Sequence, residues 1–284
     1  MKDPHDDLFE WSITEALFAT PARLFVTAWA GHMPFLFALI KLMQPRTYVE
    51  LGVHFGGSFV CACTAARRYS PATQCIGVDS WQGDIHAGAY DGNAAYAKLQ
   101  DYLSTAFPQA KLIRETFDAA RDKFTDGSID ILHIDGFHSY DVVKRDFEHW
   151  HQKLSNRGIV LFHDTAVRER EFGVWKFWEQ IKGRYRTMEF FHASGLGVVF
   201  IGEDQPVVVK RLLAQWDENR AFREFFRTAC EHAGESLRAR MYPTAAETLA
   251  SLTQQSRMWK LLWPITKHSG IFRKADEIGR LVIR

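Results

Sequence analysis

The sequence predicts an α/β protein built on a doubly wound, mostly parallel β-sheet, and three features support this. Short apolar runs recur along the chain without the polar–apolar alternation of half-exposed strands, as in IDILHID at residues 129–135. Amphipathic stretches of helical period separate these runs, as in residues 140–154. The regular alternation of strand and helix predicts right-handed βαβ units on one sheet.

The composition is that of a globular protein without a strong charge bias. The chain has 284 residues, 46% of them hydrophobic, so it can bury the core of one large domain, or of one domain with an appendage. A formal net charge of +1 gives no argument for a nucleic-acid partner. The irregular spacing of the four cysteines favours buried, reduced thiols, and the acidic N-terminus lacks a signal-peptide core. We therefore expect a cytoplasmic protein.

A helical segment is expected first, over residues 1–44. Its apolar run at residues 24–43 is interrupted by His32, Pro34 and Lys41, which favours a buried helix over a membrane span. The sheet domain then follows over residues 45–204. Its expected strands are residues 47–53, 74–80, 110–115, 129–135, 158–164 and 195–202, and its expected helices are residues 56–69, 93–107, 118–124, 140–154 and 172–185.

The ends of the first two strands carry the residues expected of a nucleotide-type site. In VELGVHFGGSF, Glu50 closes the first strand, Gly52 permits a tight turn, and Gly56 lets the backbone approach a ligand. Ser58 either caps the following helix or hydrogen-bonds the ligand. Asp79 at the tip of the second strand suits the two hydroxyls of a ribose. The spacing is not GxGxxG, so the dinucleotide fingerprint is absent.

These two stretches, VELGVHFGGSF and GVDSW, resemble motifs I and II of class I S-adenosylmethionine-dependent methyltransferases. The stretches VDSWQGDIHAGAY, FTDGSIDILHIDGFHSYDVVKRDFEHW, RGIVLFHDTAVRE and FGVWKFWEQIK are similar to a bacterial subgroup associated with sugar and polysaccharide modification. Its relatives include sugar O-methyltransferases of macrolide antibiotics and rhamnosyl O-methyltransferases. The resemblance covers residues 45–202 and implies a Rossmann-like, seven-stranded sheet in the order 3-2-1-4-5-7-6, with the last strand antiparallel.

The resemblance also implies a set of cofactor-binding residues. Glu50, Gly52 and Gly56 would bound the methionine end of S-adenosylmethionine, and Asp79 would hold its ribose. Phe117 and Asp118, just past the third strand, fall where the adenine would lie.

The polar residues after the fourth and fifth strands are the candidate catalytic centre. Neighbouring strands lie roughly 5 Å apart, so Asp135, His138, His163 and Asp164 can converge at the cofactor's edge. Methyl transfer to a hydroxyl needs in-line positioning and removal of the hydroxyl proton. The resemblance implies that Asp135 and Asp164 bind a divalent cation and that His138 is the general base.

This chain departs from the macrolide enzymes at His163, where they carry a second acid. A site made of Asp135, His163 and Asp164 has fewer hard oxygen ligands than Mg²⁺ prefers, which leaves room for Mn²⁺ or a transition metal. His163 alternatively has a structural place. His133, inside the strand, is interpreted as a packed, hydrogen-bonded core histidine.

Acceptor-binding residues are expected in two loops. Residues 81–92 after the second strand supply aromatic and polar groups of the kind that grip sugars, namely Trp81, Asp84, His86 and Tyr90. Arg168 could line the same pocket. The alternatives are a plain surface loop and a solvated charge run.

The C-terminal appendage, residues 205–284, has a helical pattern without strands. Its last part, from residue 254, carries seven Lys or Arg against two acidic residues, with Trp259 and Trp263 one helical turn apart. A basic helix with aromatic anchors suits a membrane interface carrying anionic lipid. We expect an oligomerisation or docking helix, which would form a homo-oligomer, with peripheral contact at the inner membrane face as the alternative.

The leading functional hypothesis is an S-adenosylmethionine-dependent O-methyltransferase acting on a sugar hydroxyl of a bacterial glycan or glycolipid intermediate. An NAD-dependent nucleotide-sugar oxidoreductase or epimerase is the alternative among enzymes, against which the missing GxGxxG and YxxxK motifs count. A third reading is a non-catalytic methyltransferase fold that serves as a binding module in a glycan-assembly complex.

Overall fold

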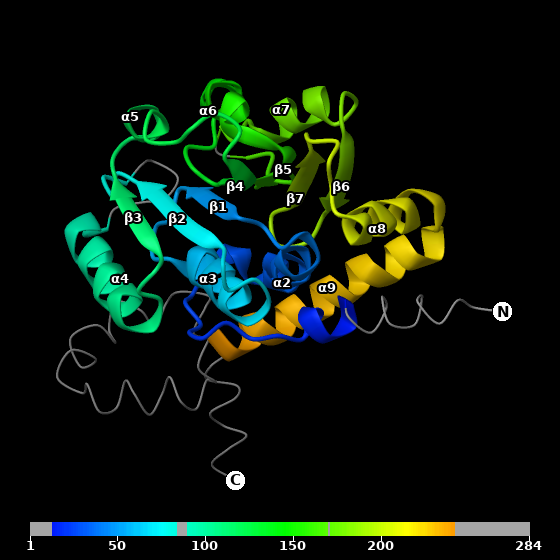
Figure 1. The fold of residues 1–284 in the computed structure, drawn as a ribbon, viewed down its shortest axis with the longest axis horizontal. Coiled ribbons are helices and arrows are strands. Elements are labelled where there is room, and N and C mark those ends of the chain that lie inside the picture. Colours follow the sequence, from blue (N-terminus) through cyan, green and yellow to red (C-terminus); the bar gives the residue numbers. More distant parts are fainter. Residues whose placement is uncertain (1–12, 84–89, 170, 242–284) are drawn as a thin grey trace, which may run out of the picture. The chain divides into compact units, whose positions relative to one another are not determined.

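The computed structural model describes residues 13–83, 90–169 and 171–241. Within them, a seven-stranded sheet has the order β3-β2-β1-β4-β5-β7-β6 (Figure 1). The strands are β1 (Thr47–Leu51), β2 (Gln74–Asp79), β3 (Lys111–Arg114), β4 (Ile129–Ile134), β5 (Leu154–His163), β6 (Arg186–Phe190) and β7 (Leu196–Phe200). All neighbours are parallel except β7, which is antiparallel to β5 and β6. The predicted fold class and strand order are confirmed.

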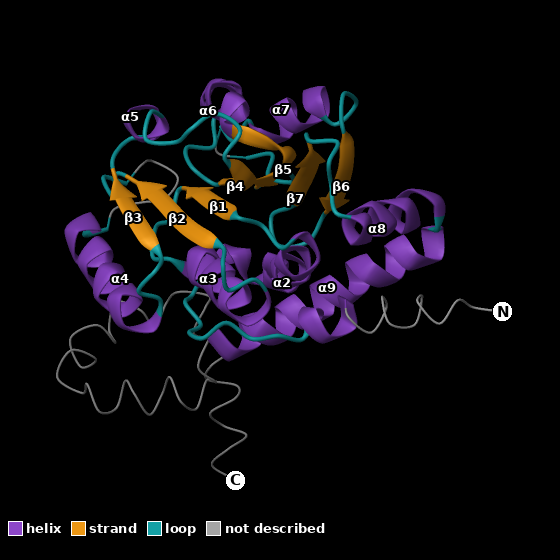
Figure 2. Ribbon diagram, in the orientation of Figure 1, coloured by secondary structure: helices purple, strands orange, loops and turns teal. Residues whose placement is uncertain are grey.

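Helices cover both faces of the sheet (Figure 2). On one face lie α5 (Phe117–Arg121), α6 (Tyr140–Trp150) and α7 (Val174–Ile181), and on the other lie α2 (Met33–Met43), α3 (Gly57–Tyr69) and α4 (Gly92–Ala106). The remaining helices are the 3₁₀ turns η1 (Ala28–His32) and η2 (His151–Lys153), together with α8 (Val207–Glu218) and α9 (Arg220–Met241).

Aromatic packing fixes the helices against the sheet on the α6–α7 face. Phe147 of α6, Phe162 of β5 and Phe177 of α7 have ring centroids 5.5–5.8 Å apart and are all buried. Aromatic side chains of this size dominate the energetics of such a core. The packing holds the end of β5, which carries candidate site residues, at a fixed place relative to α6.

Two elements differ from the sequence prediction. The helix expected over residues 140–154 ends at Trp150, and after η2 the chain enters β5 at Leu154, which pairs with Ile129. The helical pattern of apolar residues extended past Trp150 because it included Leu154. That residue is apolar because it belongs to β5. Strand β6 was not among the strands predicted from local pattern, because it is a sheet edge with exposed and buried positions mixed along it.

The apolar run near the N-terminus forms the buried helix α2, as predicted. Pro34 lies in its first turn, where a missing N–H costs nothing, and Phe35 packs on Phe190 of β6 at 4.7 Å. Across the described residues, no helix combines the length and apolar character that a membrane crossing requires.

The chain divides into two compact units, Met1–Arg238 and Ala239–Arg284. Helix α8 and most of α9 therefore belong to the same unit as the sheet, whereas the sequence placed a boundary at residue 205. Trp216 of α8 and Phe226 of α9 are buried and pack on Phe190, at 5.5 and 6.2 Å. Trp259 and Trp263 lie outside the described residues.

Candidate active site

The loop after β1 makes a close approach to the end of β4. Gly52 has a φ of +93°, and a Cβ added there would lie 2.0 Å from the carbonyl oxygen of Asp135. Gly56, with a φ of +88°, is the N-cap residue directly before α3. Only glycine meets both demands, namely a left-handed backbone and no side chain at the contact. The loop predicted to receive the cofactor is thus locked to the strand end that carries Asp135.

Asp79 anchors that loop through backbone hydrogen bonds. Its Oδ2 accepts from the N–H groups of Val53 and His54, each at 2.9 Å, and its Oδ1 accepts from the N–H of Trp81 at 2.7 Å. His54 and Trp81 both have positive φ, at 51° and 53°. A non-glycine residue holds such a conformation only when its surroundings enforce it. Asp79 therefore shapes the turn, and its contact with a ribose remains a prediction.

Glu50 is fully buried and its carboxylate is satisfied from within the protein. It accepts hydrogen bonds from the hydroxyls of Tyr48 at 2.6 Å and Ser58 at 2.8 Å, and lies 3.1 Å from Nδ1 of His133. His133 is a buried, hydrogen-bonded core histidine, as interpreted from the sequence. In the structure the Ser58 hydroxyl donates to Glu50, and capping of α3 by Ser58 is not seen; the contact of either residue with the cofactor stays a prediction.

The two residues predicted to meet the adenine, Phe117 and Asp118, make contacts in different places. The ring of Phe117 lies against Gly136, whose added Cβ would be 2.4 Å from it, so this ring borders the end of β4. Asp118 points elsewhere and pairs with His149 of α6 at 2.9 Å, with both side chains about half exposed. Asp118 is therefore a surface ion-pair residue in this structure.

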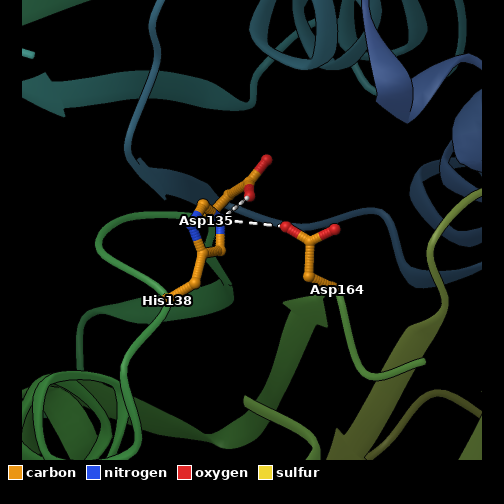
Figure 3. Close-up of side chains that lie close together, drawn as sticks. All are labelled: Asp135, His138 and Asp164. Atoms are coloured by element: carbon orange, nitrogen blue, oxygen red, sulfur yellow. Dashed lines mark hydrogen bonds and ion pairs between the residues drawn. The ribbon is translucent and has the colours of Figure 1, made fainter. Parts of the chain in front are cut away.

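The four polar residues predicted to converge do lie together. His138 Nε2 is 2.9 Å from Asp164 Oδ2 and 3.4 Å from Asp135 Oδ1 (Figure 3). His163 Nδ1 lies 3.2 Å from Asp135 Oδ1 and 3.3 Å from Asp164 Oδ2. We call these residues, Asp135, His138, His163 and Asp164, the acid–imidazole cluster. The adjacency of β4 and β5 brings them together, as the strand order predicted.

The loop that follows β5 holds His138 in place. The ring of Phe172 stacks on the imidazole of His138, with centroids 4.6 Å apart and planes 13° apart. The N–H of Gly173 donates to the carbonyl of His138 at 2.7 Å. Asp164 itself has a φ of +62°, so the chain turns sharply as it leaves the strand. The imidazole is therefore fixed from both its backbone and its face.

His163 is almost fully buried and has acceptors on both sides of its ring. Nδ1 faces the two carboxylates, and Nε2 lies 3.3 Å from the carbonyl oxygen of Ala193. Carboxylates and carbonyls only accept hydrogen bonds, so both ring nitrogens are placed to donate. This arrangement suits a charged imidazolium.

The charged groups of the cluster shift one another's pKa. Burial alone would raise the pKa of Asp135 and lower that of His163, but their mutual attraction outweighs it, so the pKa of Asp135 lies well below its usual range and that of His163 well above. Burial would also lower the pKa of His138, whereas hydrogen bonds to Asp135 and Asp164 raise it to about 9. Burial opposes a lower pKa at Asp164, but His163 and His138 lower it nonetheless.

The cluster also offers a donor set for a cation. Asp135, His138 and Asp164 each present one ligand atom, and these atoms lie within 4.8 Å of one another. Two carboxylate oxygens and an imidazole nitrogen suit Mn²⁺ or another transition metal as well as Mg²⁺. His163 Nδ1 faces the same two oxygens that a cation would need.

The residues predicted to bind the acceptor are spread over several roles. The ring of Trp81 is buried, and its N–H donates to the carbonyl of His54 at 2.8 Å, so Trp81 supports the loop. Tyr90 packs with His54 and the exposed Phe55 at 4.7 and 5.3 Å. Asp84 and His86 lie outside the described residues.

Arg168 donates to the carbonyl of Thr165 at 2.8 Å, and its guanidinium lies over the ring of Trp175 at 4.5 Å. The sequence did not point to His54, Phe55 or Phe172. His54 and Phe55 lie within the glycine loop itself, where aromatic residues between glycines were the available signal. The contact of Phe172 with His138 crosses from one loop to another and leaves no local pattern.

The observed strand order is the one that the resemblance to S-adenosylmethionine-dependent methyltransferases implies. Residues 49–165 match the family model described as a methyltransferase domain. The matched part is less than half of the chain, and it contains both the β1 loop and the acid–imidazole cluster.

Over 178 residues the chain is 44% identical to the "Uncharacterized protein y4gI" of Sinorhizobium fredii, a match that covers 63% of this chain and 20% of that protein. The chain thus spans about a fifth of the length of this relative.

Two solved structures are similar at low identity. A proposed caffeoyl-CoA O-methyltransferase of Staphylococcus aureus is 16% identical, with a TM-score of 0.49 over 71% of this chain and 93% of that one. CalS11, a TDP-rhamnose 3′-O-methyltransferase of calicheamicin biosynthesis, is 15% identical, with a TM-score of 0.46 over 72% of this chain and 97% of that one.

Proposed function

We propose that this chain transfers a methyl group from S-adenosylmethionine to a sugar hydroxyl of a bacterial glycan or glycolipid intermediate. The observation that carries the proposal is the placement of His138 between two carboxylates, at 2.9 and 3.4 Å, on strand ends beside the β1 loop. The backbone of Gly52, in the loop after β1, is in contact with Asp135 and so brings this loop next to the acid–imidazole cluster. A proton acceptor then lies next to the loop expected to hold the methyl donor.

For methyl transfer the protein mainly has to position the two substrates in line and remove the proton of the acceptor hydroxyl. S-adenosylmethionine supplies, when bound, a methyl group on a positively charged sulfur. A sugar hydroxyl is a very weak acid and attacks well only as its proton leaves. His138 is the group we assign to accept this proton, because its ring is held by Phe172 and it is an imidazole beside two carboxylates, Asp135 and Asp164.

The charge state of His138 sets a condition on this role. With a pKa raised to about 9 by Asp135 and Asp164, the imidazole is protonated at neutral pH in the free protein. It can act as a base only after it has lost that proton, for which its partly exposed side chain gives a path to solvent. We therefore expect methyl transfer in the metal-free protein to increase as the pH rises from 7 toward 9.

A divalent cation is the second part of the proposal. Asp135 and Asp164, with His138 or His163, would hold Mg²⁺ or Mn²⁺, and the cation would lower the pKa of the acceptor hydroxyl. A cation on Nε2 of His138 would prevent that nitrogen from taking a proton. The two parts are therefore separable by experiment.

Removal of metal distinguishes the role of His138 as a base from the role of a divalent cation. With a cation in the site, we expect treatment with a chelator to abolish methyl transfer and added Mn²⁺ or Mg²⁺ to restore it by mass action. Activity that survives the chelator but is lost in His138→Ala would assign the reaction to a metal-free base mechanism. Activity in both samples would remove both roles from the cluster.

The sugar acceptor rests on the sequence resemblance and on the aromatic side chains beside the β1 loop. Phe55 is exposed and packs with Tyr90, which provides flat apolar surface of the kind that stacks on sugar rings. Peripheral contact of the basic segment, residues 254–284, with the inner membrane face and homo-oligomerisation also belong to the proposal. Those residues lie outside the described part of the chain.

Calorimetric titration tests the cofactor and the rival function together. We expect S-adenosylhomocysteine to bind the full chain and NAD not to bind. Methyl-labelled S-adenosylmethionine, incubated with nucleotide-linked and lipid-linked deoxysugars, should then label a sugar in the wild type and not in His138→Ala, as read by mass spectrometry. Binding of NAD alone would favour the oxidoreductase or epimerase reading, and binding of S-adenosylhomocysteine without transfer to any sugar would remove the acceptor class.

A further inference from the structure

The segment before β1 forms the wall behind the acid–imidazole cluster. Trp29 of η1 is buried, and its ring lies 4.9 Å from that of His133 and 6.3 Å from that of His163. His32, also buried, lies 5.5 Å from His163 in an edge-to-face arrangement. These residues precede the region that matches the methyltransferase domain, residues 49–165. The site therefore draws on a part of the chain outside that domain match.

Two matched hydrogen bonds tie this segment to the turn between β6 and β7. His32 Nε2 lies 3.0 Å from the carbonyl oxygen of Ala193, and His192 Nε2 lies 3.0 Å from the carbonyl oxygen of Gly31. Both bonds join residues 161 positions apart in the sequence. A Cβ added to Gly31 would lie 2.5 Å from that of Ala193, so the two backbones are in direct contact.

The carbonyl of Ala193 is shared between the segment and the cluster. It faces Nε2 of His32 at 3.0 Å and Nε2 of His163 at 3.3 Å. A carbonyl oxygen has two lone pairs, so it can accept from both rings at once. Because His32 is buried, it has no water to replace this partner.

The turn that presents this carbonyl is conformationally unusual. Ala193 and Ser194 have φ values of 48° and 72°, in a region that non-glycine residues seldom adopt. The N–H of Ala166, two residues past Asp164, donates to the carbonyl of Ser194 at 2.9 Å. The turn is thus held between the loop that follows β5 and the N-terminal segment, which is the pattern expected when surrounding structure enforces an unfavourable backbone.

We propose that His32 is a positioning residue, which acts through the Ala193 carbonyl to set the ring orientation of His163 against Asp135 and Asp164. Removal of the His32 donor leaves the Ala193 carbonyl with one partner fewer, so that the carbonyl and the His163 ring shift and Nδ1 no longer meets both carboxylates. If His32 only fills space, substitutions of similar bulk at His32 and at His192 should have the same effect on the His163 ring. The consequence for methyl transfer rests on the proposed function, whereas the consequence for the His163 ring does not.

Three variants of the full chain test the proposal. His32→Phe keeps a flat ring and removes the donor, and His32→Gln restores an N–H at a similar reach. His192→Phe is the matched control, because it removes the other 3.0 Å bond between the same two segments and leaves the His163 contact in place. Imidazole ¹⁵N–¹H spectra report the ring environment, and His163→Asn identifies which signals belong to His163.

We expect His32→Phe to shift the His163 signals, His32→Gln to return them toward the wild-type positions, and His192→Phe to leave them unchanged. Methyl transfer should fall by about 10- to 100-fold in His32→Phe, as for lost support of a site residue, while S-adenosylhomocysteine binding stays within about twofold. Unchanged His163 signals in folded His32→Phe, or equal shifts in His192→Phe, would overturn the proposal. If His32→Phe does not fold, His32→Asn, whose shorter amide stops short of the carbonyl, takes its place in the same comparison.

The same samples separate this proposal from the proposed function. Wild-type protein without affinity for S-adenosylhomocysteine would defeat the proposed function, and the His163 spectra would still decide the role of His32. Normal cofactor binding and transfer with unmoved His163 signals would defeat the role of His32 alone.

Discussion

The ends of β1 and β2 differ from the ends of β4 and β5 in what their carboxylates contact. Glu50 and Asp79 take their hydrogen bonds from hydroxyls, from backbone N–H groups and from one core imidazole. Asp135 and Asp164 instead both face the imidazoles of His138 and His163, and Asp135 also lies 3.9 Å from Nε2 of His133. On the first pair of strands the acids shape the backbone, and on the second they set the charge of neighbouring bases. One side of the site therefore holds its loop through hydrogen bonds, and the other side pairs carboxylates with imidazoles.

The largest effect should come from His138→Ala on the side of β4 and β5. General-base removal costs about 10²- to 10⁴-fold in rate, so methyl transfer should fall by that factor while S-adenosylhomocysteine affinity stays near the wild-type value. His149→Ala is the control, since it removes another histidine paired with an aspartate at 2.9 Å, but on the surface. Single-turnover kinetics and calorimetry measure the two quantities. Near-normal turnover in His138→Ala would reduce the cluster to a polar strand end.

On the side of β1 and β2 the expected effect falls on binding. Asp79→Ala frees the N–H groups of Val53, His54 and Trp81, so the loop loses its anchor as well as any ribose contact. We expect S-adenosylhomocysteine affinity to weaken by about 1–3 kcal/mol, as for loss of a charged hydrogen-bond acceptor. Asp118→Ala serves as the comparison because that carboxylate pairs with His149. Equal losses in the two variants would mean that both acids reach the cofactor, and unchanged affinity in Asp79→Ala would remove its role.

Local pattern was sufficient to predict most of the helices and strands, whereas the strand order was predicted from the family resemblance. Apolar runs and amphipathic stretches gave six of the seven strands, and the edge strand β6 was missed because its burial is mixed. Asp135, His138 and Asp164 were also readable, since residues that directly follow adjacent parallel strands meet at one edge of the sheet.

What the sequence could not give are contacts between distant segments and the direction of individual side chains. His32 and Ala193 are 161 residues apart, and no periodicity connects them. Asp118 directly follows Phe117, yet only Phe117 borders the end of β4, while Asp118 points to His149. Trp81 looked like an acceptor contact, but its positive φ turns the ring into the protein.

The smallest expected effect is a difference in how stability depends on pH. The pKa of His138 is raised to about 9 in the folded protein, from 6.5 for an ordinary histidine. A group with a raised folded pKa stabilises fully below its unfolded pKa, and this stabilisation is lost as the pH rises through the folded value. The pKa values of Asp135 and Asp164 are lowered, so their contribution persists above pH 4 and is lost only in acid. The cluster therefore stabilises most between about pH 4 and pH 6.5.

Thermal unfolding between pH 7 and pH 9.5 at low salt isolates the alkaline side of this window. Asp146, whose burial raises its pKa to about 6, has finished titrating below it, and Tyr69, raised to about 12, titrates above it. We expect the Tm of the wild type to fall relative to that of His138→Ala across this range, by about 2–4 °C for each kcal/mol lost.

Ser58→Ala, on the side of β1 and β2, completes the comparison. It removes a neutral donor from Glu50, so it should lower Tm by an amount that does not change across this pH range. Because the wild type, His138→Ala and Ser58→Ala share every other titrating group, differences between their curves belong to the two strand pairs. Parallel curves for the wild type and His138→Ala would mean that His138 carries no extra charge stabilisation. In that case the charge of His138 would no longer distinguish the ends of β4 and β5 from the ends of β1 and β2.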